Sequence, residues 1–261
     1  MNTNRNGYPR DHVSASQINV YLMCPLKYRN SYVDQLPRPF KSVDLALGFA
    51  FHAAVEWWHK HRKNRSSPDA EDVSRILAAD LLAQAEETLR FKAGKTLEDA
   101  INLGKQLVAT YVKEYQGKTV LNTEVAFRVP MVDLETGEEL EMPLVGYFDL
   151  LEENDTVVET KTAARAYDHL TILNHLQLTA YGYAYRVLHE RDANLRLDVV
   201  TKTKQPRMQS VEVSRDKSDM VRFFHLAKSV TGAIQNSCFH PNHGWQCSSC
   251  EFAEPCRKWR G

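Results

Sequence analysis

The sequence predicts an α+β fold, because the spacing of its apolar residues changes twice along the chain. Apolar residues recur at helical spacing before residue 119, alternate with polar residues over 119–162, and then return to helical spacing. Hydrophobic residues make up 43% of the 261 residues and charged residues 25%, which is ordinary for a globular protein. We therefore expect residues 1–261 to form one elaborated domain.

The first part of this domain is expected to be a helical block. Ser14 followed by Gln17 is typical of a helix N-terminus, and Pro25 follows that helix. His52 lies beside the apolar face of the next helix. Apolar residues at helical spacing indicate three further helices, over 43–61, 73–89 and 97–115.

Alternating residues then predict three strands that polar turns join into a β-meander. The strands are expected near 119–129, 139–151 and 156–162, followed by a helix over 168–189, strands over 195–203 and 208–213, and a helix over 216–235. The domain thus divides into a helical part carrying Cys24 and His52, a core of sheet and helix, and a C-terminal segment. Their boundaries are 14–118, 119–214 and 215–261.

Charge and hydropathy exclude two broad classes of protein. Thirty-three basic and thirty-three acidic residues cancel, so the chain does not coat nucleic acid by bulk charge. No run approaches the roughly 18 apolar residues of a membrane helix, and the first residues are polar. We expect a cytoplasmic protein without a membrane partner.

Two carboxylates and a lysine form the candidate catalytic site. Asp149 ends one expected strand, and Glu159 and Lys161 point to the same face of the next, while Thr160 points to the other. The short turn can bring Asp149 beside Glu159, and carboxylate oxygens suit Mg²⁺ or Mn²⁺. Lys161 could then stabilise charge on a phosphate, and we expect Gly146 to allow close approach of a backbone or of DNA.

Together with Gln177 and Tyr181, four residues apart on the following helix, these residues resemble the PD-(D/E)XK nuclease superfamily, in its RecB-like exonuclease branch. The resemblance implies a restriction-endonuclease-like core, a central mixed sheet flanked by helices. It also implies catalytic roles for Asp149, Glu159, Lys161, Gln177 and Tyr181. The implied metal ligands are His52, Asp149, Glu159 and the carbonyl of Thr160; Glu124 on the first strand is either a further candidate or a solvated charge.

Four cysteines form a second candidate metal site. Cys247, Cys250 and Cys256 lie within ten positions on a loop with prolines, and Cys24 is the best fourth ligand. Four thiolates suit either tetrahedral zinc or an iron–sulfur cluster. The arrangement resembles iron–sulfur nucleases of the same branch, including CRISPR-associated nucleases and AddB-type domains, which implies a structural [4Fe-4S] cluster that ties the two ends together. Cys238 is expected to be a packed thiol, with His240 and His243 as spare ligands.

The sequence thus favours a Mg²⁺- or Mn²⁺-dependent DNA exonuclease acting on single strands or frayed ends, in DNA repair, recombination or CRISPR spacer acquisition. A helicase or a CRISPR integrase would suit it as a partner. The rival hypothesis is a non-catalytic nucleic-acid-binding or adaptor protein with a four-cysteine zinc site. In either case DNA would meet local basic groups and stacking aromatic residues. The candidates are 60–63, Lys202, Lys204, Arg207 and 257–260, with Tyr28, Tyr32 and Trp245 for stacking.

Overall fold

The computed structural model describes residues 11–261 except 65, 67 and 87, so the first ten residues of the expected domain lie outside the described residues. Five strands form the central sheet in the order β3-β4-β5-β6-β7. They are β3 (Val120–Val132), β4 (Glu139–Glu152), β5 (Thr156–Ala163), β6 (Asn194–Thr201) and β7 (Met208–Val213). Only β5 and β6 pair in parallel in this sheet, because the chain between them crosses over through helices. The sheet is therefore mixed, and the α+β prediction is confirmed.

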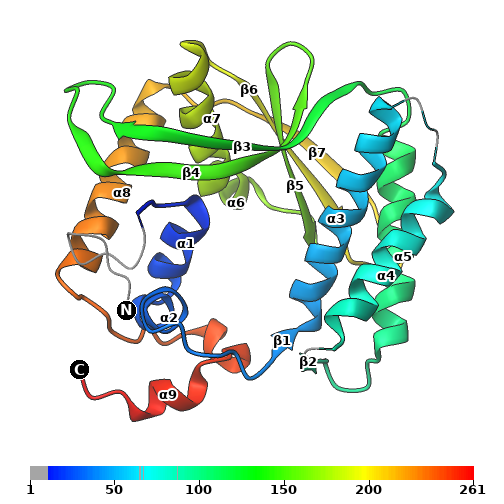
Figure 1. Ribbon diagram of the computed structural model, residues 1–261, viewed down its shortest axis with the longest axis horizontal. Coiled ribbons are helices and arrows are strands. Elements are labelled where there is room, and N and C mark those ends of the chain that lie inside the picture. The colour runs from blue at the N-terminus through cyan, green and yellow to red at the C-terminus, as the bar shows by residue number, and fades with distance from the viewer. Residues whose placement is uncertain (1–10, 65, 67, 87) are drawn as a thin grey trace.

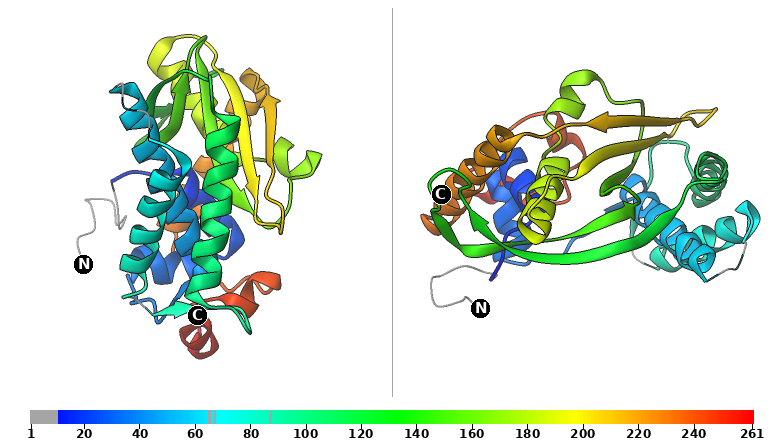
Figure 2. Two further views of the ribbon diagram at one scale, coloured as in Figure 1. Left: turned by 90° about the vertical axis from the view of Figure 1, so that its right-hand side faces the viewer. Right: turned by 90° about the horizontal axis from the view of Figure 1, so that it is seen from above.

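Helices flank the sheet on both faces (Figures 1 and 2). The first group is α1 (Ala15–Met23), α2 (Pro25–Tyr28), a π-helical turn (Arg29–Val33), α3 (Val43–Lys63), α4 (Ala70–Gln84) and α5 (Leu97–Glu114). The second group is α6 (His169–Leu173), α7 (Leu176–His189), α8 (Lys217–Gln235), a 3-10 turn (Trp245–Ser249) and α9 (Ala253–Lys258). Two short strands, β1 (Lys41–Ser42) and β2 (Leu89–Arg90), pair in parallel outside the sheet.

The alternation of residues along β5 divides the core into two hydrophobic clusters. Val158 packs with α3, α4 and α5 on one face, whereas Val157 packs with α1, α7 and α8 on the other. Successive side chains of a strand point to opposite faces, so one run of apolar residues can serve both clusters. β5 is consequently covered on both sides, and polar groups placed on it are shielded from water.

Local signals in the sequence account for several helix ends, and two expectations were wrong. Ser14 Oγ accepts the backbone N–H of Gln17 at 3.2 Å, which confirms the first helix start. The helix expected over 73–89 ends at Gln84, and Leu89 belongs to β2. The helix expected over 168–189 is interrupted between α6 and α7, where the ring of His175 caps the new helix by accepting the N–H of Leu178 at 3.4 Å. Periodicity misses such a break because the apolar spacing continues across it.

None of the helices in the described part of the chain combines the length and the apolarity needed to cross a membrane.

Gly146 leaves room for a neighbouring ring, and its expected role in the close approach of a backbone or of DNA stays a prediction. A Cβ atom at this position would lie 2.5 Å from Cζ of Phe127. The Phe127 ring is buried and packs 4.6 Å from the ring of Phe148 and 6.2 Å from that of Tyr181, measured between centroids. A side chain at position 146 would therefore displace the rings that support Asp149 and Tyr181.

We expect Gly146→Ala to lower the free energy of unfolding by about 1–3 kcal/mol, because the buried Phe127 ring has no room to move. Gly232→Ala is a matched control, since Gly232 lies in α8 with no atom within 4 Å of the added Cβ. That change should raise stability by about 0.5–1 kcal/mol through helix propensity. Urea unfolding measures both, and equal stabilities of the two variants would contradict the packing role.

Candidate functional site

The candidate site lies where β4 and β5 separate. The two strands pair at only three positions, ending with Leu150 opposite Val158. Beyond this point Oδ2 of Asp149 accepts the backbone N–H of Thr160 at 2.8 Å. A side chain thus takes the place of a ladder hydrogen bond, and it holds a carboxylate between the two diverging strands. We call this place the fork.

His52 and Glu124 complete a tight group with Asp149. Among the described residues, this is the one group of three or more metal-ligating side chains whose ligand atoms all lie within 4.8 Å of one another. His52 Nδ1 is 3.8 Å from Asp149 Oδ2. Glu124 lies between residues that pair with Leu150 and Phe148, which sets it opposite Asp149. Its φ of 47° is rare for a residue with a side chain, and no pattern in the sequence predicts this backbone conformation.

Burial raises the pKa of the carboxyl groups of Glu124 and Glu159. The pKa of Glu124 rises to about 7 because of burial, with further contributions from the charges of Asp149 and Glu56. The pKa of Glu159 rises to about 8 because of burial and the charge of Asp149. Burial also lowers the pKa of His52, a shift that Asp149 partly opposes. Near neutral pH the His52 ring is therefore uncharged, and one of its nitrogens can offer a lone pair to a metal ion.

Glu159 is completely buried, and the ammonium of Lys161 and the hydroxyl of Tyr181 lie within hydrogen-bonding reach of its carboxylate. The ammonium group of Lys161 lies against Oε1 as an ion pair. Burial by itself would lower the pKa of Lys161, but the charges of Glu159 and Asp149 outweigh it and raise the pKa above its usual value. One ammonium does not balance two neighbouring carboxylates, and a further cation would.

A chain of hydrogen bonds connects Lys161 to Asp149 through α7. Lys161 Nζ donates to Oε1 of Gln177 at 3.1 Å, and Nε2 of Gln177 donates to the hydroxyl of Tyr181 at 2.9 Å. The Tyr181 hydroxyl in turn donates to Oδ1 of Asp149 at 3.0 Å. The three bonds run in one direction, from the ammonium of Lys161, which also contacts Glu159, to a carboxylate oxygen of Asp149.

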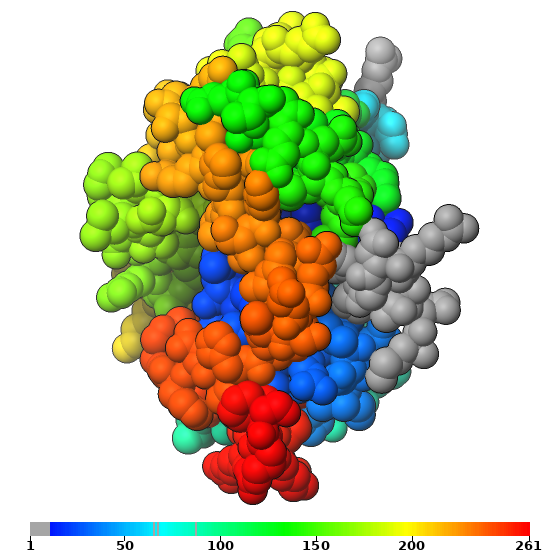
Figure 3. Space-filling view, turned by 90° about the vertical axis from the view of Figure 1, so that its left-hand side faces the viewer, coloured from blue at the N-terminus to red at the C-terminus, as the bar shows by residue number. Residues whose placement is uncertain are grey.

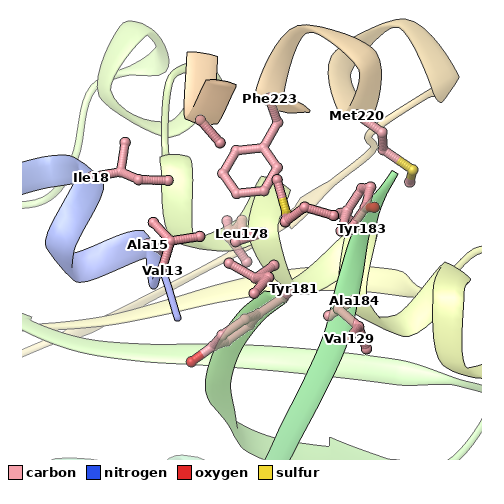
Figure 4. Packing of buried hydrophobic residues seen from close by; sticks show 14 of the residues in the cluster. Val13, Ala15, Ile18, Val129, Leu178, Tyr181, Tyr183, Ala184, Met220 and Phe223 are labelled. Atoms are coloured by element: carbon pink, nitrogen blue, oxygen red, sulfur yellow. The ribbon is translucent and has the colours of Figure 1, made fainter. Parts of the chain in front are cut away.

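The packing of α7 keeps this chain of hydrogen bonds in place. The ring of Tyr181 packs among apolar residues of α1, α7, α8 and the sheet, and its hydroxyl points away from the other labelled side chains (Figure 4). Burial raises the pKa of this hydroxyl well above its usual value, so it stays protonated and donates. Gln177 lies one turn before Tyr181 on the same face of the helix.

The structure thus brings six of the predicted residues to one place: His52, Asp149, Glu159, Lys161, Gln177 and Tyr181. Two details differ from the expected metal shell. Glu124 joins the tight group, while Glu159 lies outside it against Lys161. The backbone carbonyl of Thr160 interacts with His52, so this oxygen also faces the fork. Carboxylate, carbonyl and imidazole donors together suit a divalent cation.

The four cysteines line a second hollow, far from the fork in sequence. Cys24, Cys247, Cys250 and Cys256 border one cavity of about 160 Å³, and none of them forms a disulfide. His243 also lines this cavity, whereas His240 is not among its lining residues. The pKa of the Cys256 thiol is raised by burial and then by the other three sulfurs, which reflects their proximity.

Protein contacts hold the two ends of the chain together around this hollow. The N–H of Leu26 donates to the carbonyl of His240 at 3.0 Å, and Asn242 Nδ2 donates to the carbonyl of Met23 at 3.0 Å. Lys27 forms an ion pair with Glu251 at 2.9 Å. Figure 3 shows the N-terminal and C-terminal segments side by side on one face of the molecule.

Several other predicted residues lie elsewhere than expected. Tyr28 is 2% exposed and stacks on Phe239 in the core, and Tyr32 packs against the same cluster, so neither is a platform for bases. Trp245 is 82% exposed. Cys238 is exposed and not a packed thiol, because the chain leaves α8 before reaching it.

The predicted basic group at 60–63 is not a set of free charges. Lys60 forms an ion pair with Glu56, and Arg62 donates to the carbonyls of Tyr115 and Lys118 at 3.2 Å. Lys63 donates to Asn122 at 2.7 Å. These cations serve mainly to attach the end of α3 to its neighbours.

Two solved structures and one family model resemble this chain. The crystal structure of a "Putative exonuclease" from Eubacterium rectale matches with a TM-score of 0.63 at 13% identity, over 100% of this chain and 94% of that one. The crystal structure of SSO0001 matches with a TM-score of 0.38 at 18% identity, over 90% and 92% of the two chains. No curated protein matches the sequence. The model of the PD-(D/E)XK nuclease superfamily matches residues 12–257, and the chain therefore belongs to that superfamily.

Proposed function

We propose that the protein is a metal-dependent DNA exonuclease that hydrolyses phosphodiester bonds at the fork. The observation that carries this proposal is the completely buried Glu159, which lies against the ammonium of Lys161 and is affected by the charge of Asp149. Two carboxylates and one ammonium in a buried place leave negative charge that a divalent cation would balance. Membership of a nuclease superfamily supports the same reading.

The residues of the fork fit a Mg²⁺ or Mn²⁺ ion. Asp149, Glu159, His52 and the carbonyl of Thr160 would hold it, with Glu124 as an added ligand. Such an ion would polarise a phosphoryl oxygen and lower the pKa of a bound water. The left-handed backbone at Glu124 turns its carboxylate toward Asp149, which supports this addition.

Lys161 would act as the electrostatic catalyst. Its raised pKa keeps the ammonium charged, and a fixed positive charge stabilises the negative charge that develops on phosphate oxygens. Gln177 accepts a hydrogen bond from Lys161 and so would orient the ammonium. Tyr181 would do the same for Asp149.

We assign digestion from ends, with a preference for single strands or frayed ends, from the resemblance to RecB-like nucleases. The similarly folded protein from Eubacterium rectale carries the word exonuclease in its printed name. The rival function, a non-catalytic adaptor, gives no reason for the hydrogen-bond chain from Lys161 to Asp149.

The four cysteines are proposed to hold a structural [4Fe-4S] cluster. All four line one cavity, and the other three sulfurs help to raise the pKa of the Cys256 thiol, which supports a shared site. Four thiolates suit zinc as well as an iron–sulfur cluster. The choice of the cluster rests on the resemblance to iron–sulfur nucleases.

We expect Lys161→Ala to reduce Mn²⁺-dependent degradation of end-labelled DNA by about 100-fold or more, because the fixed charge at the phosphate is lost. Lys202→Ala is the matched control, since Lys202 is a partly buried lysine at the end of β6 that pairs with Asp44. It should cleave at nearly the wild-type rate. Undiminished cleavage by Lys161→Ala would contradict the assignment of Lys161 as the electrostatic catalyst.

We expect the thermal stability of the metal-free protein to fall as pH rises from about 5 to 8. The pKa of Glu159 is about 8 and that of Glu124 about 7 in the folded protein, above the usual values, so folding binds protons over this range. Removing those protons leaves uncompensated buried charge. Added Mn²⁺ should lessen the fall, because the cation replaces the protons.

Melting temperatures in EDTA and in Mn²⁺ across this range measure the effect. Glu159→Gln should flatten the EDTA profile, since an amide does not titrate. A wild-type profile that rises with pH in EDTA would contradict the burial of protonated carboxyl groups.

We expect Cys24→Ser to lose most of the bound iron and the visible absorption of anaerobically purified protein, and to melt at a lower temperature. Cys238→Ser is the control, because Cys238 is exposed and does not line the cavity. It should keep iron and stability. Colourless wild-type protein containing one zinc per chain would instead support the zinc site of the adaptor hypothesis.

A further inference from the structure

A hollow of about 660 Å³ lies beyond the fork, between the loop after β5 and the turn that joins β6 to β7. Arg165, Lys204 and Arg207 line it, and no carboxylate does. All three side chains are exposed. Within the described residues, no ion pair of 4.0 Å or less joins any of the three to a carboxylate. The hollow is therefore cationic, and Asp168, which is not among its lining residues, is the carboxyl group that the charge of Arg165 affects.

The neighbouring hollow has a different electrostatic character. It has a volume of about 490 Å³ and shares Lys204 with the first, but its other lysines have acidic partners. Lys92 and Lys202 lie 2.8 Å and 2.9 Å from carboxylate oxygens of Asp44, and Lys95 lies 4.0 Å from Asp99. An anion would have to compete with these carboxylates there, whereas no carboxylate lines the first hollow.

We call this first hollow the cationic hollow; it lies beyond the end of β5, the strand that carries Glu159 and Lys161. Arg165 follows Lys161 by four residues, so their Cα atoms are at most about 14 Å apart. The N–H of Lys202 donates to the carbonyl of Ala163 at 2.6 Å, which holds the β6–β7 turn beside the end of β5. Tyr167 lies between the fork and the cationic hollow. The charges of Lys161 and Glu159 both act on its hydroxyl.

Hydrogen bonds fix the walls of the hollow. The side-chain amide of Gln209 accepts the N–H of Tyr167 at 2.8 Å and donates to its carbonyl at 2.9 Å, as a neighbouring strand would. The carbonyl of Arg207 accepts the N–H of Thr201 at 2.9 Å, and its N–H donates to Thr201 Oγ1 at 3.1 Å. The backbone near Arg165 and at Arg207, which supply two of the three cationic side chains, is thus anchored to the sheet.

We propose that this hollow binds backbone phosphates of the same DNA strand whose scissile bond lies in the fork, a few nucleotides away. This inference rests on the proposed nuclease function. Guanidinium and ammonium groups bind phosphate oxygens with charge-assisted hydrogen bonds. Phosphate contacts carry no base information, so they position a strand of any sequence, as digestion from an end requires.

The test compares the triple variant Arg165→Ala, Lys204→Ala, Arg207→Ala with the control Lys92→Ala, Lys95→Ala from the neighbouring hollow. Fluorescence anisotropy measures the Kd for labelled single-stranded oligonucleotides, with Ca²⁺ in place of Mg²⁺, between about 50 and 200 mM salt. The slope of log Kd against log salt should fall by about 2 in the triple variant, since each single-strand phosphate contact contributes about 0.7. The control should change Kd by less than about twofold, because exposed ion pairs contribute little.

A second measurement localises the contact. Neutral methylphosphonate linkages are placed singly along the oligonucleotide, and wild-type binding should weaken at two or three positions near one another, at a fixed distance from the end. The triple variant should show no further loss at those positions, because both changes remove the same contact. In cleavage assays its KM should rise about tenfold or more, with little change in kcat.

Failure of the phosphate site and failure of the proposed nuclease function give different results. A triple variant that keeps the wild-type salt slope and the wild-type methylphosphonate pattern would overturn the phosphate site and leave the nuclease function standing. Wild-type protein that neither binds nor cleaves single-stranded DNA would overturn the proposed function itself.

Discussion

The hydrogen bond from the Thr160 N–H to the Asp149 carboxylate is the interaction on which the candidate site depends. Two antiparallel strands normally satisfy each other's backbone groups, and strands that separate leave such groups without partners. Here a side chain satisfies one of them, so β4 and β5 can diverge without leaving that buried N–H unpaired. The same bond fixes a carboxylate beside Glu159 and the carbonyl of Thr160.

The rest of the site follows from placing charge on a strand that is covered on both faces. Glu159 cannot reach water, so its charge must be balanced by Lys161, by a proton or by a cation. The hydrogen bonds through Gln177 and Tyr181 limit how the charged groups can move. In the metal-free fork protons and the ammonium of Lys161 balance the carboxyl groups, and a divalent ion would take the place of those protons.

The hollow lined by the four cysteines and the cationic hollow lie at two different edges of the protein core. Hydrogen bonds and an ion pair hold the first and last segments together around the cysteines, so a cluster would reinforce contacts that the protein already makes. The cationic hollow lies beyond the end of β5, and no carboxylate is among its lining residues. The proposed chemistry and the proposed strand path thus share one strand of the sheet.

The sequence by itself was enough for the α+β class, the order of the strands and most of the site, because strand alternation and helix spacing are local. Glu159 and Lys161 share a face of β5 for that reason, as do Gln177 and Tyr181 on α7. Tertiary structure decided the remainder. The burial of Tyr28, the ring of Phe127 against Gly146, the left-handed backbone of Glu124 and the gathering of Arg165 with Arg207 all arise from contacts between distant segments. Periodicity records which face of an element is apolar, but not which neighbour will cover it.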